Sequence, residues 1–490
     1  MPNTSECLYR AAQIREAERI AIEELHITGD ELMRRAGSAA FALLQKQWPE
    51  TKRISVFCGS GNNGGDGYVV AKLAWQAGYQ LRVFAIEDTA LLKGEALAAC
   101  QEFLQAGGEV NVFSPDCFIP PDGIIVDALL GIGINRQVMG NYALAINAIN
   151  ASDNPVLAMD ICSGLHADTG CAMGNAVQAD FTISFIGLKC GLFTADAANY
   201  CGEIICADLA LPEVIFAAIQ PLARLQTKTA LPVKSRTAHK GHFGHVLCVG
   251  GNFGYSGAIR MAAEAALRTG AGLVSIASRA SHADMLNIGR PELMCHAVED
   301  VRELQKLLAG ADVVVIGPGL GQDDWAQALF NAVIACELPK VVDADALNLL
   351  AKTPVQRNDW ILTPHPGEAS RLLDCSTSAI GEDRYLAIQS LQNTYGGVCV
   401  LKGSGSLLSD GRQLFVATTG NPGMSSGGMG DVLSGIIAGL RAIGLSSLAA
   451  ANLGVYVHGE AADRQASKHG EYGMLASDLF AEMRACLNQR

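Results

Sequence analysis

The amino-acid sequence predicts two α/β domains in succession, each a parallel sheet between two layers of helices (a three-layer αβα fold). Short apolar runs alternate with helical stretches in both halves of the chain, as is typical of buried parallel strands covered on both faces. Clusters of glycine directly follow several of these runs. The length of 490 residues also exceeds the size at which a single hydrophobic core keeps growing.

The first half contains apolar runs that we interpret as strands. The first run ends at Cys58 and leads into a glycine-rich loop, after which a helix is expected over 68–76, with Gly78 ending it. The runs cover 54–58, 81–86, 123–127, 155–160 and 181–185. Their alternation with helices predicts a Rossmann-like first domain.

A boundary between the domains is expected near the middle of the chain. Between 211 and 236 the sequence carries Pro212, Pro221 and Pro232 among small and basic residues, without a clear strand. We interpret the end of this segment as an interdomain linker. The predicted domains therefore cover 1–220 and 225–490.

The second half restarts the same alternation. Its apolar runs cover 245–249, 273–277, 312–316, 340–343, 360–363 and 397–401. One helix is expected over 257–269, ending at Gly270, and an apolar helix follows Asp431 through Leu440. These elements predict a second α/β domain with the same layers and no recognisable sequence repeat of the first.

The charge balance excludes two classes of partner. The chain has 36 basic and 49 acidic residues, which gives a formal net charge of −13. An anionic surface repels nucleic-acid backbones and anionic membranes, and no long basic run offsets it. We therefore expect no nucleic acid and no membrane as partner, and any phosphorylated substrate must be held by local groups such as helix N-termini.

The cysteines and the N-terminus predict a cytoplasmic protein. The 15 cysteines are scattered singly, without a Cys-x-x-Cys pair, as expected for reduced thiols. The N-terminal stretch has no apolar signal core. No segment approaches the ~20 apolar residues that a membrane helix needs.

The glycine-rich loop of the first half is a candidate site. The segment 59–64 matches the G-x-G-x-x-G pattern of dinucleotide-binding loops, which is weak evidence alone. Asn62, Asn63 and Asp66 argue against a simple dinucleotide-binding loop, because a carboxylate beside pyrophosphate repels it unless a cation intervenes. The loop suits hydroxyl groups, an amide or a metal ion better, and a glycine turn that serves only packing is the structural alternative.

Two further predicted strands end in polar residues. Asp127 closes one strand and leads into the segment 128–136, while Asp160 closes another and is followed by Ser163. Ligands of open α/β sheets bind outside the carboxyl ends of the strands, so the three loops should converge on one crevice. One acidic strand end is commonly a structural cap, but three polar strand ends favour a binding site.

Together these segments resemble the NAD(P)H-hydrate epimerase family over roughly residues 1–215. The resemblance rests on the segment 61–67, the segment 127–133 and the segment 160–164. It implies a monovalent cation, typically K⁺, held by Asn63, Asp127 and Ser163. The residues that it implies for binding the hydrated nicotinamide nucleotide are Asn62, Asn63, Gly64, Gly65, Asp66, Gly131, Ile132, Gly133, Ile134, Asn135, Arg136, Gln137 and Asp160.

The epimerisation needs a group that moves a proton at the hydroxyl-bearing ring carbon next to the ring nitrogen. Asp160, at the floor of the expected crevice, is our choice for this acid and base. Lys189, at another strand end, is a second candidate, and a surface lysine is an equally plausible explanation of it. Ile161 and Cys162 stand where members of the family often have Pro and Ser, which leaves the local backbone open.

The strongest motif in the chain is a second glycine-rich loop, 421–430, before an apolar helix. Its glycines expose N–H groups at the helix N-terminus, where the helix dipole favours anions. Asp431 is placed to take a proton from a hydroxyl group facing a bound phosphate. An N-cap aspartate after a flexible loop is the structural alternative, which the four glycines of the loop weaken.

This loop resembles the G-x-G-D anion hole of ribokinase-like enzymes and implies a ribokinase-like second domain. Together with the segments 239–244, 250–258, 317–321, 363–368 and 402–406, it resembles the NAD(P)H-hydrate dehydratase family over roughly residues 225–490. The resemblance implies that Ala258, Gly319, His365 and Asp431 contact the hydrate. It also implies that ADP, with Mg²⁺ on its phosphates, contacts Lys402, Gly403, Ser404, Gly405, Ser406 and Gly430.

Three functions compete at this point. The first is a bifunctional repair enzyme that epimerises the R and S forms of hydrated NADH or NADPH and dehydrates the S form at the expense of ADP. The second is a ribokinase-like small-molecule kinase with an accessory nucleotide-binding domain. The third is a non-enzymatic nucleotide sensor, which Asp431 disfavours because a carboxylate facing phosphate weakens binding. Spacing alone does not separate kinase from dehydratase, and the resemblance favours the dehydratase, expected as a homo-oligomer.

Overall fold

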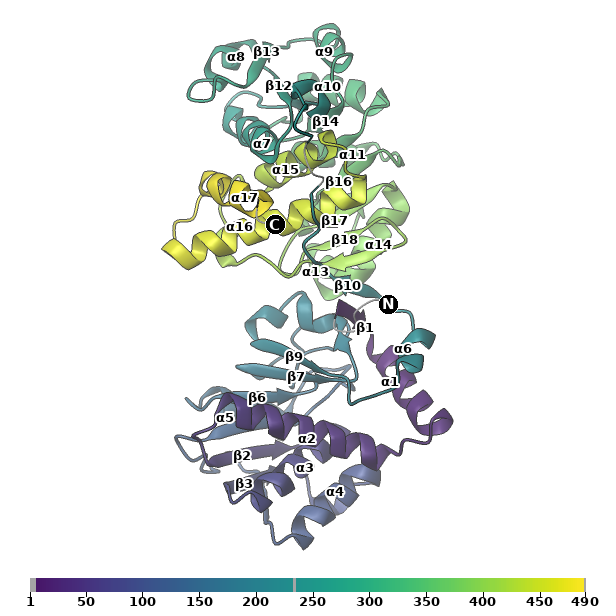
Figure 1. Ribbon diagram of the computed structural model, residues 1–490, viewed down its shortest axis with the longest axis vertical. Helices are drawn as coiled ribbons and strands as arrows, with labels where there is room; N and C mark the ends of the chain where they lie inside the picture. The colour runs from purple at the N-terminus through teal and green to yellow at the C-terminus, as the bar shows by residue number, and fades with distance from the viewer. Residues whose placement is uncertain (1–5, 232–234, 489–490) are drawn as a thin grey trace. The chain divides into compact units, whose positions relative to one another are not determined.

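The structure is a computed structural model that describes residues 6–231 and 235–488. The chain divides into two compact units, Met1–Arg224 and Leu225–Arg490, which Figure 1 colours from purple to teal and from teal to yellow. Each unit has its own parallel sheet and its own hydrophobic cores.

The first unit is built on a parallel sheet with the strand order β4-β3-β2-β5-β6-β7-β9. Counted along the chain from β2, this order is 3-2-1-4-5-6-7, which extends the Rossmann order and confirms a Rossmann-like fold. The order reverses between β2 and β5, so a crevice is expected at their carboxyl ends. The strands are β2 (Arg53–Cys58), β3 (Gln80–Ala85), β4 (Val110–Val112), β5 (Ile124–Ala128), β6 (Val156–Met159), β7 (Phe181–Phe185) and β9 (Glu203–Ala207).

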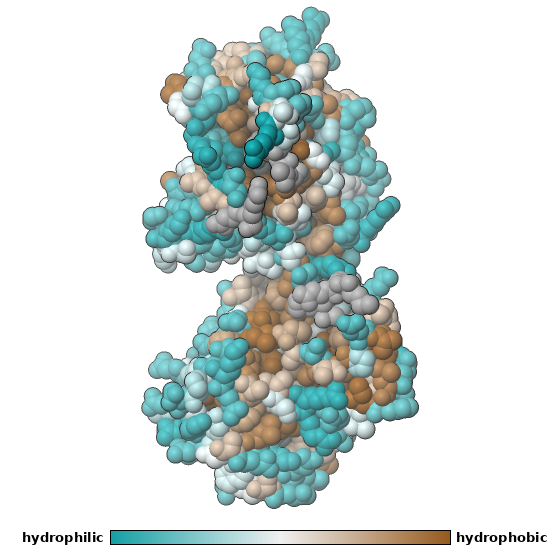
Figure 2. Space-filling view, viewed as in Figure 1, coloured by the Kyte–Doolittle hydropathy of each residue, from teal (hydrophilic) through white to brown (hydrophobic). Residues whose placement is uncertain are grey.

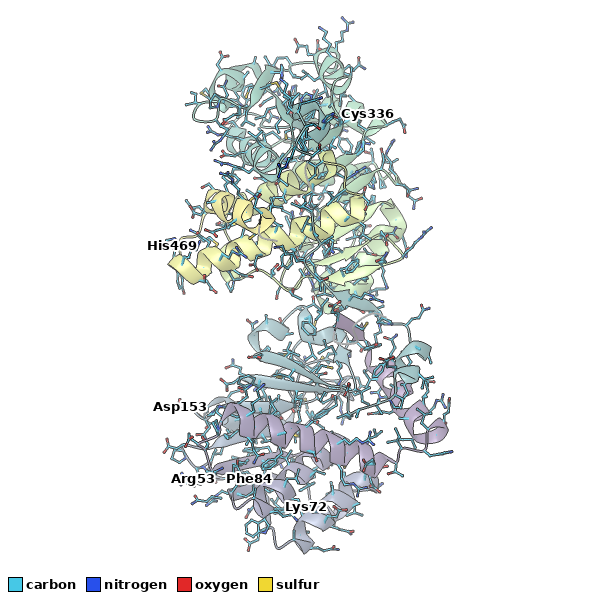
Figure 3. The ribbon with its side chains drawn as sticks, viewed as in Figure 1. Arg53, Lys72, Phe84, Asp153, Cys336 and His469 are labelled. Carbon is cyan, nitrogen blue, oxygen red and sulfur yellow. The ribbon has the colours of Figure 1, made fainter. Side chains whose placement is uncertain are left out.

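Helices cover both faces of this sheet. Val56 of β2 packs into the core beneath α2 (Gly29–Gln47), α3 (Asn62–Gln76) and α4 (Gly94–Gln105), whereas Phe57 packs on the other face against α5 (Gly140–Asn150). Lys72 on α3, labelled in Figure 3, forms a 2.8 Å ion pair with Glu102 on α4. Helix α1 (Ala11–Arg19) adds Ile14 to the first core, and the π-helical turn η2 (Ile20–Glu24) adds Ala21. The three predicted layers are therefore present.

Helix α3 begins at Asn62, so the prediction that 59–67 is a loop and the helix starts at residue 68 is wrong beyond Gly61. Glycine makes this early start possible, because the first turns lie against other backbone. A Cβ on Gly64 would come 2.0 Å from the carbonyl oxygen of Gly59, and one on Gly67 would come 2.6 Å from the Cβ of Ala128. Tertiary contact thus overrides the low helix propensity of Asn and Gly.

The remaining elements of the first unit include three short strands. β1 (Cys7–Tyr9) pairs in parallel with β8 (Leu188–Lys189) and antiparallel with β10 (Ala223–Leu225). The segment 211–236 was expected to lack a clear strand, but it contains β10 and the helix α6 (Glu213–Ala218). Both are too short to leave a periodic signal, and Pro232 lies outside the described residues. Short 3₁₀ turns are η3 (Thr89–Leu91), η4 (Cys190–Phe193) and η5 (Ala197–Asn199).

The second unit has the same winding. Its sheet runs β13-β12-β11-β14-β15-β16-β17-β18-β19, which is 3-2-1-4-5-6-7 from β11, followed by the antiparallel pair β18 and β19. The order reverses between β11 and β14. The strands are β11 (His245–Val249), β12 (Leu273–Ser278), β13 (Met294–Ala297), β14 (Val313–Ile316), β15 (Lys340–Val342), β16 (Trp360–Leu362), β17 (Val398–Leu401), β18 (Leu407–Ser409) and β19 (Leu414–Val416).

Two helical layers enclose this second sheet. Val246, Val315 and Val400 face a core shared with α7 (Ser256–Thr269), α15 (Met429–Ala442), α16 (Ser447–His469) and α17 (Leu479–Asn488). On the opposite face α10 (Asp324–Ala335) contacts β14 and α14 (Arg384–Tyr395) contacts β17. The other elements are α8 (Ala280–Leu286), α9 (Val301–Leu308), α11 (Ala344–Lys352), α12 (Pro366–Leu372), α13 (Thr377–Glu382), η6 (Lys240–Phe243), η7 (Pro422–Met424) and η8 (Ala476–Asp478).

Hydrophilic residues cover much of the visible surface of each unit, with hydrophobic patches between them (Figure 2). Across residues 6–231 and 235–488, no helix combines the length and the hydropathy needed to cross a membrane.

Candidate functional site

A cavity of about 990 Å³ opens in the first unit at the carboxyl ends of its central strands. Ser60 to Asn63 and Asp66 line it after β2, Leu129 to Met139 after β5, and Asp160 after β6. The expected convergence of three loops on one crevice is therefore found, at the point where the strand order reverses. A volume of this size lies at the upper end of the range for small-molecule sites.

Most of the residues that the resemblance implied for the substrate line this cavity. They are Asn62, Asn63, Asp66, Gly131, Ile132, Gly133, Ile134, Asn135, Arg136, Gln137 and Asp160. Gly64 and Gly65 instead lie buried behind the wall, where a Cβ on Gly65 would come 2.5 Å from the Cε of Met33. These two glycines thus let α3 pack closely and bring Asn63 and Asp66 to the cavity.

Asp127 and Ser163 form a buried network beside the cavity wall. Both side chains are fully buried, and the Ser163 hydroxyl donates a 2.6 Å hydrogen bond to Oδ1 of Asp127. The backbone N–H of Ser163 donates to Oδ2 at 2.9 Å, and the N–H of Leu129 donates to Oδ1 at 3.2 Å. Burial raises the pKa of Asp127 to about 6, although these hydrogen bonds oppose the rise.

Asn63 supplies the observation that tests whether a cation fits here. Its side chain is buried, with 8 % exposure, and both of its polar atoms lack a hydrogen-bond partner among the described residues. A Cβ on Gly131 would lie 3.3 Å from the Cβ of Asn63, so the first turn of α3 and the loop after β5 touch at this point. An unpaired buried amide costs ~1–3 kcal/mol, which a bound cation at its oxygen would relieve. The residues therefore fit a cation with oxygen ligands.

Asp160 and Lys189 form a buried ion pair at the floor of the cavity. The Lys189 ammonium donates to Oδ1 of Asp160, to the carbonyl oxygen of Phe185 at 2.9 Å and to the hydroxyl of Ser184 at 3.1 Å. The Lys189 side chain is fully buried, so the alternative that it is a surface lysine is wrong. Asp160 has a φ of 67°, a left-handed conformation that aspartate tolerates better than most residues.

Sequence reasoning missed Glu18 on α1, which lines the same cavity. Burial, and then the charge of Asp160, raise the pKa of Glu18 above its ordinary value. Burial and the charges of Asp160 and Glu18 raise the pKa of Asp66 well above its ordinary value. Glu18 stands far from the glycine-rich loop in sequence, and nothing in the sequence of α1 marks it as a site.

In the second unit, the loops after β11 and β14 bind one another where the strand order reverses. The N–H of Asn252 donates to the carbonyl oxygen of Gly319 at 2.7 Å, and that of Gly251 donates to Pro318 at 3.1 Å. A Cβ on Gly319 would lie 3.3 Å from the Cβ of Ala258. The structure thus brings together Ala258 and Gly319, two residues implied to contact the hydrate.

Lys402, at the end of β17, is the centre of a second buried charge cluster. Its ammonium lies 2.9 Å from Oδ1 of Asp343 and 3.7 Å from Oε2 of Glu368, and the Ser434 hydroxyl donates to Oδ2 of Asp343 at 2.8 Å. Burial alone would lower the pKa of Lys402, but the charges of Asp343 and Glu368 raise it above its ordinary value. Burial opposes ionisation of Asp343, yet Lys402 and its hydrogen-bond partners hold its pKa below the ordinary value.

Asp431 lies in the first turn of α15, next to this cluster. Burial and then the charge of Asp343 raise the pKa of Asp431 to about 7. A Cβ on Gly430 would lie 3.1 Å from the Nζ of Lys402, so glycine leaves room for the ammonium beside the helix N-terminus. A cationic group and a carboxyl group poised near neutral pH therefore share one glycine loop.

The other implied residues occupy nearby loops. His365 caps α12, accepting hydrogen bonds at Nδ1 from the N–H groups of Gly367 (3.0 Å) and Glu368 (3.3 Å), and its side chain is 51 % exposed. Burial and the charge of Lys402 lower its pKa, which favours the neutral ring. Gly403, Ser404, Gly405 and Ser406 form the turn of the β17–β18 hairpin.

Asp343, Glu368 and Ser434 were not identified as site residues from the sequence. Asp343 did carry a signal, because it directly follows an apolar run, as Asp160 does. Ser434 lies inside an apolar helix and gave none.

Comparison with known families and proteins places both halves of the chain. The family model described as NAD(P)H-hydrate dehydratase matches residues 246–484, and the model described as YjeF-related protein N-terminus matches residues 29–191. A protein of Coxiella burnetii named bifunctional NAD(P)H-hydrate repair enzyme Nnr is 50 % identical over 98 % of this chain and 99 % of its own length. The chain belongs to this family of bifunctional NAD(P)H-hydrate repair enzymes.

A second relative agrees with this membership. The Escherichia coli enzyme of the same name is 43 % identical over 98 % of this chain and 94 % of its own length. A solved ADP/ATP-dependent NAD(P)H-hydrate dehydratase from Bacillus subtilis, crystallised with ATP and Mg²⁺, is 27 % identical, with a TM-score of 0.48 over 52 % of this chain and 93 % of that chain. The family and enzyme class predicted from the motifs are confirmed for this NAD(P)H-hydrate repair enzyme.

Proposed function

We propose that the two units of this repair enzyme carry the two activities separately. The unit ending at Arg224 interconverts the R and S epimers of hydrated NADH and NADPH. The unit beginning at Leu225 dehydrates the S epimer back to the reduced nucleotide at the expense of ADP. The single observation that carries this assignment is Asp431, a carboxyl group with a pKa of about 7 beside the glycine loop and Lys402.

The dehydration has a chemical reason to use a phosphate donor. Hydroxide is a poor leaving group, whereas a phosphate ester is a much better one. Asp431 takes the proton of the substrate hydroxyl, whose oxygen attacks the β-phosphorus of ADP and displaces AMP. The ring nitrogen lone pair then expels phosphate, and loss of a proton from the neighbouring carbon restores the reduced ring. ADP and the hydrate become AMP, inorganic phosphate and NAD(P)H.

The residues around Asp431 suit a bound phosphate. The glycine loop leads into the N-terminus of α15, where the helix dipole favours anions, and the Lys402 ammonium adds a positive charge beside Gly430. We assign Ala258, Gly319 and His365 to the hydrate, and Lys402, Gly403, Ser404, Gly405, Ser406 and Gly430 to ADP.

Magnesium fits this site as a partner of the nucleotide. No group of three or more His, Cys, Asp or Glu side chains in the described residues could hold a metal ion alone. Mg²⁺ is commonly held by one or two carboxylates together with substrate phosphates, and Asp343 and Glu368 are the carboxylates next to Lys402. When bound, the ion neutralises the phosphate charge.

In the first unit, we propose K⁺ as the cation held by Asn63, Asp127 and Ser163, beside the cavity for the hydrate. The unpaired Asn63 amide and the buried Asp127 carboxyl support this assignment. When bound, the ion supplies a fixed positive charge that orders the loops around the substrate. Asn62 to Asp66, Gly131 to Gln137 and Asp160 hold the hydrate, and Asp160 moves the proton.

We also propose that the enzyme is a cytoplasmic homo-oligomer with small-molecule nucleotides as its partners and no nucleic acid. The formal net charge of −13 and the singly scattered cysteines support these assignments.

The proposed function is tested by mixing the protein with ADP and hydrated NADH. We expect ADP-dependent recovery of the reduced-nicotinamide absorbance, with one AMP and one inorganic phosphate per NADH. With purified R epimer, recovery should depend on the first unit. Release of a stable phosphoester instead would make the second unit a small-molecule kinase.

A further inference from the structure

Five carboxyl groups line the cavity of the first unit, those of Glu18, Asp66, Glu87, Glu95 and Asp160. Three of them come from different elements and lie close enough to interact electrostatically, and they differ in their partners. Glu18 comes from α1, Asp66 from the beginning of α3, and Asp160 from the loop after β6. Asp160 is paired with the buried ammonium of Lys189 and also accepts a 3.2 Å hydrogen bond from the N–H of Phe185. Among the described residues, no hydrogen bond or ion pair holds the carboxyl group of Asp66 or Glu18.

The different partners indicate different protonation states: a protonated carboxyl group at Asp66 and an ionised one at Asp160. Asp160 carries the negative charge that its pairing with Lys189 stabilises. Burial and the charges of Asp160 and Glu18 raise the pKa of Asp66, so its unpaired carboxyl group holds a proton more readily than an ordinary aspartate does. The two groups enter the cavity from separate strand ends, after β2 and after β6.

We propose that Asp66 is the acid that expels the substrate hydroxyl as water during epimerisation, and that Asp160 is the base that activates the returning water. This inference rests on the proposed epimerase function of the first unit. It makes Asp66 a catalytic residue and gives Asp160 one defined half of the proton transfer.

The proposed reaction has two steps. Asp66 donates its proton to the hydroxyl group, the carbon–oxygen bond breaks, and the ring nitrogen lone pair forms a double bond to the same carbon. Water leaves, and the ring becomes a cationic iminium. A water molecule then attacks that carbon from the opposite ring face and gives a proton to Asp160, which completes the other epimer. One water molecule is lost and one is gained.

The charges of the cavity suit the iminium. Asp66 becomes a carboxylate at the moment when the ring becomes positive, so the two new charges attract each other in a poorly solvated site. This attraction is absent in the neutral substrate, and it therefore stabilises the transition state selectively. The carboxyl group of Glu18 adds a further acidic group to the same cavity.

The same charges return Asp66 and Asp160 to their starting protonation states between turnovers. Once the neutral product has formed, Asp160 carries the proton next to the Lys189 ammonium, and Asp66 is ionised without a partner. Moving the proton from Asp160 to Asp66 through the water of the cavity restores the Asp160–Lys189 pair. It also removes the charge of Asp66, which has no counter-ion.

The first test follows oxygen exchange in the full-length protein. Epimer interconversion is measured in potassium buffer made with ¹⁸O-labelled water, with the uncatalysed rate subtracted. We expect one solvent oxygen to enter the hydrate for each interconversion. Interconversion with retention of the original oxygen would overturn the proposal, because it would require ring opening instead of water loss.

The second test compares Asp66→Asn with Glu18→Gln, which removes another carboxyl group of the same cavity that no hydrogen bond or ion pair holds. Loss of a general acid should slow epimerisation ~10²–10⁴-fold in Asp66→Asn. It should also abolish the fall in kcat/KM that the wild type shows as the pH rises through the pKa of Asp66. Glu18→Gln should lose much less activity and keep that fall.

The outcomes separate this inference from the proposed function. A wild-type protein that does not accelerate epimerisation would refute the proposed function itself. Rapid epimerisation by Asp66→Asn, within a few-fold of an active wild type, would refute only the role of Asp66. An equally deep loss in Glu18→Gln would also refute that role, because the total charge of the cavity would then matter instead of one acid.

Discussion

The hydroxyl of Ser163 donates a 2.6 Å hydrogen bond to the carboxylate of Asp127, although Asp127 belongs to β5 and Ser163 follows β6. The pair is fully buried, and the same unit buries the side chain of Asn63, whose amide lacks a hydrogen-bond partner among the described residues. These hydrogen bonds fix the orientation of the Asp127 carboxyl group, but no cationic side chain among the described residues pairs with it. A bound cation would complete this arrangement.

The first prediction concerns potassium and pH. Because K⁺ binds the ionised carboxylate, and burial raises the pKa of Asp127 to about 6, K⁺ should stabilise the first unit at pH 8 and much less at pH 5. Asp127→Asn should lose this response at both pH values. The measurement is the unfolding midpoint in KCl and in tetramethylammonium chloride of equal ionic strength. The matched control is Asp153→Asn, which removes an exposed carboxyl group labelled in Figure 3. An undiminished K⁺ response in Asp127→Asn would show that Asp127 does not bind the cation.

The second prediction concerns the buried pair of Lys402 and Asp343. Lys402→Met leaves the Asp343 carboxylate, 1 % exposed, without its counter-ion. Breaking such a pair costs ~3–5 kcal/mol, and the free energy of unfolding of the second unit should fall by about this much. Adding Asp343→Asn should recover part of the loss. Denaturant unfolding followed by hydrogen exchange of β17 measures both, and a Lys402→Met protein as stable as the wild type would contradict the pairing.

The third prediction concerns the glycine loop before α15. Gly428 has a φ of 91°, and a Cβ there would lie 2.4 Å from the Cε of Met261. At Gly427 nothing lies within 4 Å of an added Cβ. Gly428→Ala should therefore destabilise the second unit by ~1–2 kcal/mol, while Gly427→Ala changes its stability by less than about 0.5 kcal/mol. Equal thermal stabilities of the two variants would show that the loop does not require the left-handed conformation.

The fourth prediction is the pH dependence of the dehydration. Asp431 acts as a base only when ionised, and burial and Asp343 raise its pKa to about 7. The kcat/KM for dehydration should therefore rise with pH and level off above about 7. Rates of NADH recovery from the S epimer between pH 5.5 and 9 measure it. A flat profile through neutral pH would contradict the assignment.

Long buried strands were predictable from the sequence, and short edge strands were not. β2, β5, β11 and β14 have buried apolar residues on both faces, so their continuous apolar runs identify them. β4 (Val110–Val112) lies at the edge of its sheet and is largely exposed, so it leaves no such run.

The residues of the candidate sites divide in the same way, into those that a local sequence pattern indicates and those that it does not. Asp127, Asp160 and Asp431 stand next to strand ends or glycine loops, where local sequence signals a site. Glu18 and Ser434 reach their sites only through the packing of helices, which no local pattern reports. The start of α3 at Asn62 was missed for a similar reason, because contacts with Gly59 and Ala128 stabilise a helix that propensity disfavours.

The central claim is that one chain holds two independent sites, with Asp431 as the base of the second. Asp431→Asn is nearly isosteric, so the variant should fold and bind ADP. The decisive measurement is its ADP-dependent recovery of NADH from the S epimer, beside its rate of epimer interconversion. We predict a ~10²–10⁴-fold loss of dehydration, or roughly 3–5 kcal/mol of barrier, with epimerisation unchanged. Dehydration within a few-fold of the wild type, or loss of both activities in a folded protein, would contradict the account.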